Sequence, residues 1–423
     1  MTPADPPLLS ELHGKSLLLF DDSLTSKDGH WFAIDKAIAE LHAELGVETT
    51  IICNSSFDLA DELRATGAKV SPVIEHSIWS GFDAGSGLFN EFKGLIKLAW
   101  HFRSVLANAL RKQTFDCVLH PSGLGADLLA WCLLPRRLRG RAKRVAILTR
   151  FGLGSYSPNG PPVFARKLVF WRWMVRYLKS DFASGKFILL TDSDRLAAEY
   201  EAVSGIRPTV ACSPQAIPAS PTVCGSSRPL CFGALGWARL QKGSDFFQAA
   251  LEYLISHGQI GDLRFVMQWN RQVFRDDGTE LRRSELLSSH PQIQYIEQVL
   301  TSAEYESAMH GLDCLILPYR RKLYHSQTSG VAVEAACAGI PMIYTADTWM
   351  SDFVEEQGAG IAVADGDVDG LAQAILAMAA DYPAYKALAV ERSAIARLRN
   401  SPAEFARVLW GAGPNLRADR KAA

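Results

Sequence analysis

Two segments of the chain group small, basic and acidic residues beside expected helix starts. The first covers residues 324–343 and places Ser329, Gly330 and Val331 where a helix should begin, with Glu334 one turn further on. A helix N-terminus attracts anions because its free N–H groups and the positive end of its dipole face outward. A carboxylate in the next turn could accept hydrogen bonds from both hydroxyls of a ribose. The alternative is a helix-start glutamate that only complements the dipole.

The second segment, residues 233–243, follows an expected strand and carries Arg239 and Lys242 before another helix. Ligands of doubly wound sheets bind at the carboxyl ends of the strands, where this loop would lie. Guanidinium and ammonium groups there could bind both phosphates of a diphosphate and stabilise charge on a leaving group. Alternatively, both cations are solvated loop residues. Together the two segments predict a pocket for a nucleotide diphosphate.

The same residues carry a family resemblance. Residues 330–343, which include Glu334, resemble the donor-site segment of retaining glycosyltransferases of family 4, and residues 233–243 resemble the diphosphate-binding start of their C-terminal domain. The resemblance covers residues 229–400 closely and 15–215 loosely. It implies an α/β protein of the GT-B fold, in which two Rossmann-like doubly wound parallel-sheet domains face a cleft. It also implies transfer of a sugar from a nucleotide donor to an acceptor.

One position departs from the pattern of that family. Its members usually have two glutamates eight residues apart, and here Glu334 keeps the second while Ser326 stands at the first. Tyr324 and Ser326 are expected to border the donor sugar. The missing glutamate favours one alternative function, a non-catalytic GT-B homologue that binds a nucleotide sugar or a partner. A second alternative is a GT-B sugar-nucleotide epimerase, which would consume the donor without an acceptor. The carboxylates that an epimerase would need are not recognisable in the sequence.

In the N-terminal half, Gly29 and His30 follow the first expected strand, and His120 ends a later one. A glycine lets the backbone approach a ligand closely, and the resemblance implies that this loop faces the donor. The resemblance also implies that the strand-end histidine lies near the reacting centre. The alternatives are that His30 is a polar residue at a helix start and that His120 is a satisfied structural group.

The sequence contains no recognisable Ser-His-Asp arrangement, carboxylate pair or Asp-x-Asp metal motif. We therefore predict a reaction without a metal ion or cofactor, in which a nucleotide-diphosphate sugar is the donor substrate. The resemblance implies a front-face mechanism, in which the leaving phosphate helps to deprotonate the acceptor. Such a mechanism needs positioned cations, here Arg239 and Lys242, more than it needs a protein base.

Length and patterning predict two domains, because 423 residues exceed one comfortable core. Short apolar runs alternate with helical patterns, which is typical of βαβ units with parallel sheets. A Pro-, Ser- and Gly-rich stretch separates two series of such units. We expect an N-terminal acceptor-side domain, a linker, a C-terminal domain that binds the nucleotide sugar, and a terminal helix with a disordered tail. Their bounds are residues 1–216, 217–228, 229–400 and 401–423.

Charge is unevenly distributed, since residues 93–179 contain seventeen Lys or Arg residues and only two acidic ones. This block holds an expected amphipathic helix over residues 92–112, a basic loop over 135–144, and a helix over 163–179 rich in Trp, Phe and Arg. Basic faces flanked by aromatic rings suit anionic lipid headgroups. The alternative for each helix is a core-facing helix with solvated charges. No nucleic-acid recognition motif accompanies the block, so we expect no such partner.

The first fourteen residues lack the basic start and apolar centre of a signal peptide. No window of eighteen residues is uninterruptedly apolar. The eight cysteines are scattered, as in proteins of a reducing compartment. We expect a cytoplasmic protein, peripheral on the inner face of the membrane, with a lipid-linked or polysaccharide acceptor.

Overall fold

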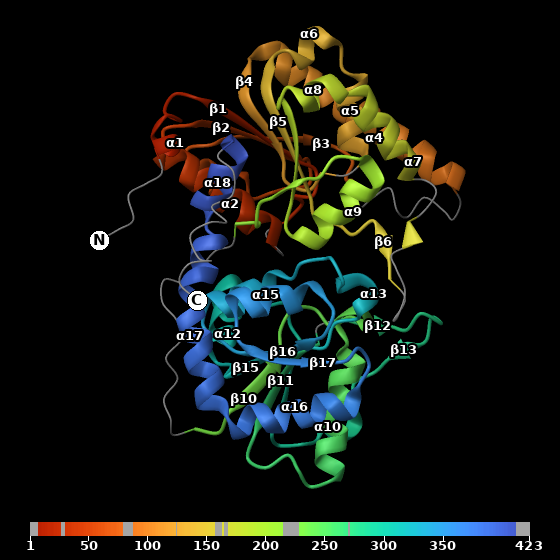
Figure 1. Ribbon diagram of the computed structural model, residues 1–423, viewed down its shortest axis with the longest axis vertical. Coiled ribbons are helices and arrows are strands. Elements are labelled where there is room, and N and C mark those ends of the chain that lie inside the picture. The colour runs from red at the N-terminus through yellow and green to blue at the C-terminus, as the bar shows by residue number, and fades with distance from the viewer. Residues whose placement is uncertain are drawn as a thin grey trace. The chain divides into compact units, whose positions relative to one another are not determined.

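The chain divides into two units, each built on its own parallel sheet (Figure 1). The computed structural model describes residues 7–26, 30–78, 88–123, 125–156, 163–164, 168–214, 228–269 and 271–411. Unit 1 comprises Met1–Gly154, Phe164–Ala216 and Asn400–Ala423, and unit 2 comprises Ser155–Val163 and Ile217–Arg399. Most of the expected linker and most of the expected tail lie outside the described residues.

Unit 1 contains a seven-stranded sheet in the order β3-β2-β1-β4-β5-β8-β9, with every pair of neighbours parallel. The bounds are β1 (Ser16–Asp21), β2 (Glu48–Asn54), β3 (Lys69–Ile74), β4 (Phe115–His120), β5 (Ala142–Thr149), β8 (Phe187–Thr191) and β9 (Thr209–Val210). The strand order reverses between β1 and β4. That position is the topological switch point of the unit, where ligands of doubly wound sheets bind.

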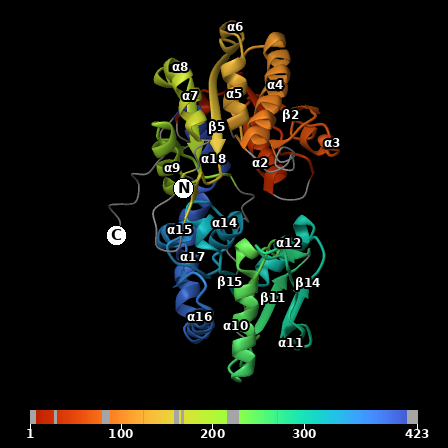
Figure 2. The ribbon, with the colours of Figure 1, turned by 90° about the vertical axis from the view of Figure 1, so that its right-hand side faces the viewer.

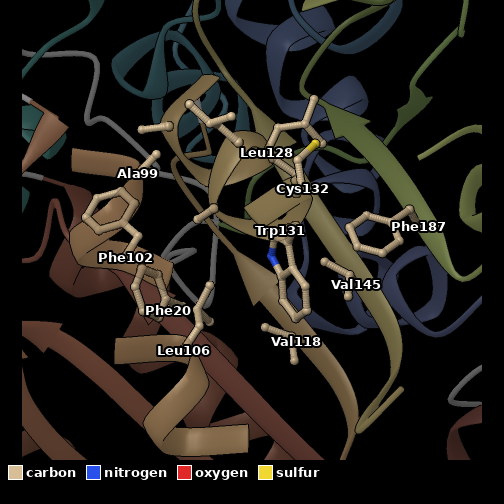
Figure 3. Close-up of a cluster of buried hydrophobic side chains, with 14 of the residues drawn as sticks. Phe20, Ala99, Phe102, Leu106, Val118, Leu128, Trp131, Cys132, Val145 and Phe187 are labelled. Atoms are coloured by element: carbon tan, nitrogen blue, oxygen red, sulfur yellow. The ribbon is translucent and has the colours of Figure 1, made fainter. Parts of the chain in front are cut away.

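Side chains of β1 are buried on both faces of this sheet. Leu17 and Leu19 belong to one buried cluster, and Leu18 and Phe20 belong to the other. A strand that is buried on both faces reads as a continuous apolar run, and this run is the signal by which the sequence predicts it. Figure 3 shows the cluster that contains Phe20, with Trp131 of a covering helix packed over the strands.

Helices cover both faces of the unit 1 sheet (Figure 1). Their bounds are α1 (Pro7–Ser10), α2 (His30–Glu44), α3 (Ala60–Arg64), α4 (Leu88–Lys112), α5 (Gly125–Leu133), α6 (Arg136–Arg139), α7 (Val169–Tyr177), α8 (Lys179–Ala183), α9 (Asp194–Ser204) and α18 (Pro402–Trp410). The last of them packs on α2: Trp410 Nε1 donates to His42 Nε2 at 3.0 Å. Burial lowers the pKa of His42 to about 4, so the ring is neutral and its Nε2 can accept.

The expected helix over residues 163–179 is wrong at its start. Val163–Phe164 forms the short strand β7, which pairs with β6 (Gly154–Ser155), and α7 begins only at Val169. Val163 is β-branched and Phe164 is aromatic, and both residue types favour strands. The apolar and aromatic residues that suggested one helix therefore belong to two elements, the strand β7 and the helix α7.

The expected basic loop over residues 135–144 is wrong as well. Pro135 occupies the N-cap of α6, and β5 already begins at Ala142. Arg139 is buried, and Lys143 Nζ lies 2.7 Å from Asp116 Oδ1. Proline is favoured at a helix start because its missing N–H costs nothing there. Part of this stretch therefore has structural partners, while Arg136 and Arg137 remain exposed.

Unit 2 contains a six-stranded sheet in the order β14-β11-β10-β15-β16-β17, again with parallel neighbours. The bounds are β10 (Cys231–Ala234), β11 (Arg264–Gln268), β14 (Ile293–Ile296), β15 (Cys314–Leu317), β16 (Met342–Thr345) and β17 (Gly360–Val363). The strand order reverses between β10 and β15, so the switch point lies there. The expected series of β and α elements in this half is confirmed.

Helices cover the unit 2 sheet on both faces, as the two buried clusters along β15 show. Their bounds are η3 (Leu240–Lys242), α10 (Ser244–Ser256), α11 (Glu285–Ser288), α12 (Ser302–His310), α13 (Arg321–Tyr324), α14 (Gly330–Cys337), α15 (Trp349–Gln357), α16 (Val368–Ala380) and α17 (Tyr382–Arg399). A small hairpin of β12 (Val273–Phe274) and β13 (Glu280–Leu281) is added outside the sheet. Figure 2 shows α10 and α16 near β11 and β15 from a second side.

Within the described residues, no helix combines the length and the apolar character that a membrane span requires. In the same part of the chain, no three His, Cys, Asp or Glu side chains are grouped so that they could hold a metal ion.

Candidate functional site

The segment with both expected cations follows β10, at the switch point of unit 2. The chain turns at Gly236, whose φ of +85° lies in the left-handed region that favours glycine. Its N–H donates to Gln268 Oε1 at 2.7 Å, at the end of β11. A second left-handed glycine, Gly243, precedes α10, and a Cβ there would overlap the carbonyl oxygen of Pro318. The loop is therefore held closely against the ends of the strands.

Lys242 extends into the space that a side chain at position 236 would fill. Its Nζ lies 2.5 Å from the ideal Cβ position of Gly236 and 5.8 Å from the ring centroid of Tyr319. Burial, and then the charge of Arg239, lowers the pKa of Lys242 to about 8, while Glu334 opposes that shift. The ammonium group is thus still largely charged at neutral pH. In such a poorly solvated place a charge acts strongly on a ligand.

Arg239 is exposed at the rim of the same site. Its guanidinium lies 5.7 Å from the ring centroid of Trp237, and that of Arg271 lies 4.0 Å from the same centroid. Burial, and then the charge of Arg239, lowers the pKa of Arg271. Arg271 is a third cation at the site, and sequence reasoning missed it because it lies on a separate loop beyond β11.

A pocket opens between this loop and the strand ends. It has about 340 Å³ of empty space, part of which is open to solvent. Its wall includes Gly236, Trp237 and Lys242 from the loop after β10, and Pro318 and Tyr319 from the residues after β15. The pocket therefore lies at the carboxyl ends of the two central strands, as expected for a ligand site in a doubly wound sheet.

The second expected segment forms the start of α14. Ser329 is the N-cap, and its hydroxyl accepts from the Ala332 N–H at 3.4 Å. No acceptor in the described part of the chain takes the N–H groups of Ser329, Gly330 or Val331. Val331 Cγ2 lies 3.7 Å from the same Cβ position of Gly236 that Lys242 approaches. The structure thus brings the two segments together, with a helix N-terminus beside the partly buried ammonium group of Lys242.

Glu334 lies one turn into α14 and is partly exposed. Tyr305 Oη, from α12, donates to Glu334 Oε2 at 2.6 Å. Burial raises the pKa of Glu334 to about 7, and the bond from Tyr305 and the charge of Lys242 both act against that rise. The carboxylate is therefore oriented by one donor, and its Oε1 takes no hydrogen bond from the residues described. Sequence reasoning missed Tyr305, which precedes Glu334 by 29 residues.

Tyr324 and Ser326, expected to border a sugar, are buried. The Tyr324 ring centroid lies 4.3 Å from that of Tyr319, and burial raises the pKa of Tyr324 to about 12. Both residues precede α14 in the chain. Their contact with a sugar stays a prediction.

The two opposed pKa shifts predict a pH optimum for ligand binding. Glu334 must be ionised to accept from two hydroxyls, so affinity for a nucleoside diphosphate should fall about tenfold per unit below pH 7. Lys242 must be protonated to attract phosphate, so affinity should fall again above its pKa of about 8. Calorimetry from pH 5.5 to 9.5 would measure both limbs.

The matched control for this profile is Glu334→Gln, which keeps the size of the side chain but removes its titration. The acid limb should then shrink to the contribution of the ligand's own phosphate. A profile that Glu334→Gln leaves unchanged would contradict this role of the carboxylate.

His120 ends β4, but the structure favours its structural reading. It is fully buried, with Nδ1 2.8 Å from Asp127 Oδ1 and Nε2 accepting from Trp131 Nε1 at 2.9 Å. Because Trp131 can only donate, Nε2 carries no proton and Nδ1–H donates to Asp127. Both ring nitrogens therefore have partners inside unit 1. This geometry accounts for His120 as a satisfied structural group, and its expected catalytic role stays a prediction.

The loop expected to face the donor lies outside the described residues at Gly29, and the side chain of His30 does too. His30 is the first residue of α2. Earlier in the chain, Asp21 ends β1 and Asp22 follows it, and both are buried. Burial raises the pKa of Asp21 to about 7 and that of Asp35 well above its usual value. The paired Asp21-Asp22 directly after an apolar strand was the sequence signal that could have marked this polar cluster.

Comparison with known proteins agrees with the architecture. Residues 227–381 match the model of the family described as Glycosyl transferases group 1. No curated protein sequence matches the chain at a significant level. The matched segment contains both halves of the unit 2 site, the loop after β10 and the start of α14.

Solved structures resemble nearly the whole chain. HepE of Anabaena, in complex with UDP and glucose, is 14% identical with a TM-score of 0.62, over 93% of this chain and 97% of that one. A sucrose-phosphate synthase from Thermosynechococcus elongatus is 14% identical with a TM-score of 0.59, over the same shares. A glycosyltransferase from Rickettsia africae is 14% identical with a TM-score of 0.59, over 94% and 97%. The expected GT-B fold is confirmed.

Proposed function

We propose that this protein is a glycosyltransferase that takes its sugar from a nucleotide-diphosphate donor bound in unit 2. The observation that carries the proposal is the meeting of three groups around Gly236: the ammonium of Lys242, the N-terminus of α14 and, one turn further, the carboxylate of Glu334. A diphosphate needs the first two, and a ribose needs the third.

The comparisons support this reading. The family model that matches residues 227–381 is a glycosyltransferase model. HepE has been solved with UDP-glucose as well as with UDP, which is a nucleotide-diphosphate sugar and its product nucleotide. These ligands belong to HepE, and we extend only their chemical class to this chain.

We further propose a retaining transfer that needs no metal ion. The acceptor oxygen would form a bond to the anomeric carbon while the bond from that carbon to the diphosphate breaks. The acceptor proton would pass to the leaving phosphate, whose charge Arg239, Lys242 and the α14 N–H groups stabilise. Arg271, at the rim of the pocket, would add to this field. These cations supply the charge that a divalent ion provides in metal-dependent transferases.

We propose a lipid-linked or polysaccharide acceptor, met by unit 1, and a place of action at the cytoplasmic face of a membrane. The support is the basic block of residues 93–179, which would suit an anionic lipid or glycan. The retaining outcome and the assignment to family 4 rest on the resemblance of residues 330–343.

The test is a thermal-shift screen of the full chain against UDP, GDP, ADP, dTDP and CMP and their sugar conjugates. A ligand that binds only the native state raises Tm by mass action, by roughly 5 °C or more at a hundred times Kd. We expect one nucleoside diphosphate to stand out. No shift with any nucleotide would overturn the donor assignment.

The same donor then separates the two alternatives. A transferase consumes donor only with an acceptor, whereas an epimerase consumes it alone. A non-catalytic homologue gives the shift without turnover against any acceptor. Donor consumption that depends on an added lipid-linked or glycan acceptor is the result we expect.

A further inference from the structure

Four aromatic rings form a continuous ladder across α4 and α7 of unit 1. Phe92 on α4 meets Phe170 on α7 edge to face, with centroids 5.3 Å apart. Phe170 stacks on Trp173 at 5.5 Å, and Trp173 stacks on Tyr177 at 5.8 Å. The guanidinium of Arg139, from α6, lies 5.5 Å from the Tyr177 centroid. The ladder therefore joins three helices that lie on one side of unit 1 (Figure 1).

Most of this ladder faces outward. Trp173 is 51% exposed, and Phe92 and Tyr177 are exposed to a similar degree. The opposite side of α7 holds Trp171 and Met174, which are buried in the core of unit 1. The alternative of a core-facing helix with solvated charges therefore accounts for the buried side of α7 but not for its exposed aromatic rings. Large exposed aromatic side chains that are grouped rather than scattered indicate an interaction site.

The charged side chains around the ladder are basic. Lys93 and Lys97 lie on the exposed stripe of α4 together with Trp100, at positions i, i+4 and i+7. Arg136 and Arg137 on α6, and Arg176 on α7, are exposed as well. Residues 92–112, 136–139 and 169–177 contain ten Lys or Arg residues and no Asp or Glu. We call this surface the aromatic–basic face; its members are Phe92, Lys93, Lys97, Trp100, Arg136, Arg137, Trp173, Arg176 and Tyr177.

The exposed cations of this face have no counter-charge among the residues that the structure describes. Lys93, Lys97, Arg136, Arg137 and Arg176 form no ion pair with any acid in the described residues. Elsewhere in unit 1 a comparable cation, Lys143, has such a partner in Asp116. This surface therefore combines positive charge that no acidic side chain of the described residues neutralises with aromatic rings that no other part of the described chain covers.

We propose that the aromatic–basic face binds the interface of an anionic lipid bilayer. Trp and Tyr rings are favoured at the headgroup level, because their apolar bodies enter the boundary while their polar ends stay hydrated. Lys and Arg side chains extend to the phosphates of anionic lipids and bury their aliphatic stems. One surface thus meets both requirements of interfacial binding. It would bring unit 1 to a membrane-held acceptor.

The experiment is co-sedimentation of the full chain with vesicles of phosphatidylcholine, with and without 30% phosphatidylglycerol. We expect pelleting only with the anionic vesicles, and weaker pelleting as salt rises, because salt screens the attraction. Arg136→Gln, Arg137→Gln and Arg176→Gln together should lower the partition coefficient about a hundredfold at low salt, since each cation contributes about a factor of five.

Trp173→Ala tests the ring ladder separately and should lower binding to the same vesicles about tenfold. The matched control is Phe274→Ala with Arg275→Gln on the unit 2 hairpin, where Phe274 is 54% exposed. This control should pellet as the unchanged protein does. All variants should keep the unchanged Tm and its rise with nucleotide, which keeps this test independent of donor binding.

Three outcomes would overturn the proposal. The first is equal pelleting of the unchanged protein with neutral and anionic vesicles. The second is pelleting of the face variants at the unchanged level. The third is that these variants lose binding to a single-stranded oligonucleotide, or lose self-association in sedimentation velocity, while vesicle binding is intact.

Discussion

Replacing Arg239 by Gln and Lys242 by Met should lower kcat for sugar transfer at least about a thousandfold. Removal of one positioned donor at a developing anion typically costs about 10²–10³ in kcat. Lys242 is the larger contributor, because its ammonium is shielded from water beside Gly236 whereas Arg239 is exposed. The measurement is donor consumption at saturating acceptor, for the double variant and each single one.

The choice of Met at position 242 keeps the aliphatic volume, so the variant loses the charge without leaving a cavity. The control is Lys322→Met, which removes an exposed cation on α13 of the same unit. Turnover of the double variant within a few-fold of the unchanged protein would eliminate the diphosphate assignment.

Replacing Glu334 by Ala should weaken binding of the nucleoside diphosphate about a hundredfold or more. Each hydrogen bond to a charged acceptor is worth about 1.5–3 kcal/mol, and the ribose offers two donors. The unliganded protein should remain folded at pH 8, since the change removes a carboxylate whose ionisation burial disfavours. Calorimetry with the nucleotide found in the thermal screen gives the affinity, and circular dichroism gives the fold.

Two companion variants separate the ribose contact from a general disturbance. Tyr305→Phe removes the donor that orients the carboxylate and should weaken binding by a smaller factor than loss of Glu334 itself. Glu391→Ala, which removes an exposed acid on α17, should leave affinity unchanged. Wild-type affinity in Glu334→Ala would take the ribose role away from this residue.

Much of the fold was predictable because its central strands, such as β1 and β15, are buried on both faces. Such strands appear in the sequence as short apolar runs. The strands expected over residues 264–268 and 314–317 agree with the observed bounds of β11 and β15. Helix starts were predictable where a cap residue precedes an apolar pattern, as Ser401 does for α18. By contrast, the aromatic residues of 163–179 satisfy both helix and strand preferences, so β7 was not separable from α7.

The unit 2 site was predictable at the positions that backbone geometry requires. Gly330 and Glu334 lie within one turn of one helix, so their spacing alone places them together. Three further residues lie at the site only because the order of the strands brings their elements there: Tyr305, Gln268 and Arg271. The spacing of residues along the sequence does not reveal that order. His120 shows the opposite case: its position at a strand end suggests chemistry, while Asp127 and Trp131 are partners to both of its ring nitrogens.

The docking of α18 on α2 has a consequence for how the protein is made. Unit 1 includes its first helices and also Asn400 onward, and the bond from Trp410 to His42 joins positions 368 residues apart. A ribosome therefore releases the strands of unit 1 long before the helix that covers one face of them. Unit 2 is synthesised in that interval and can fold first as a local unit. The part of α2 that meets α18 stays uncovered until the last turn of α18 emerges, so chaperone contact during synthesis should concentrate there.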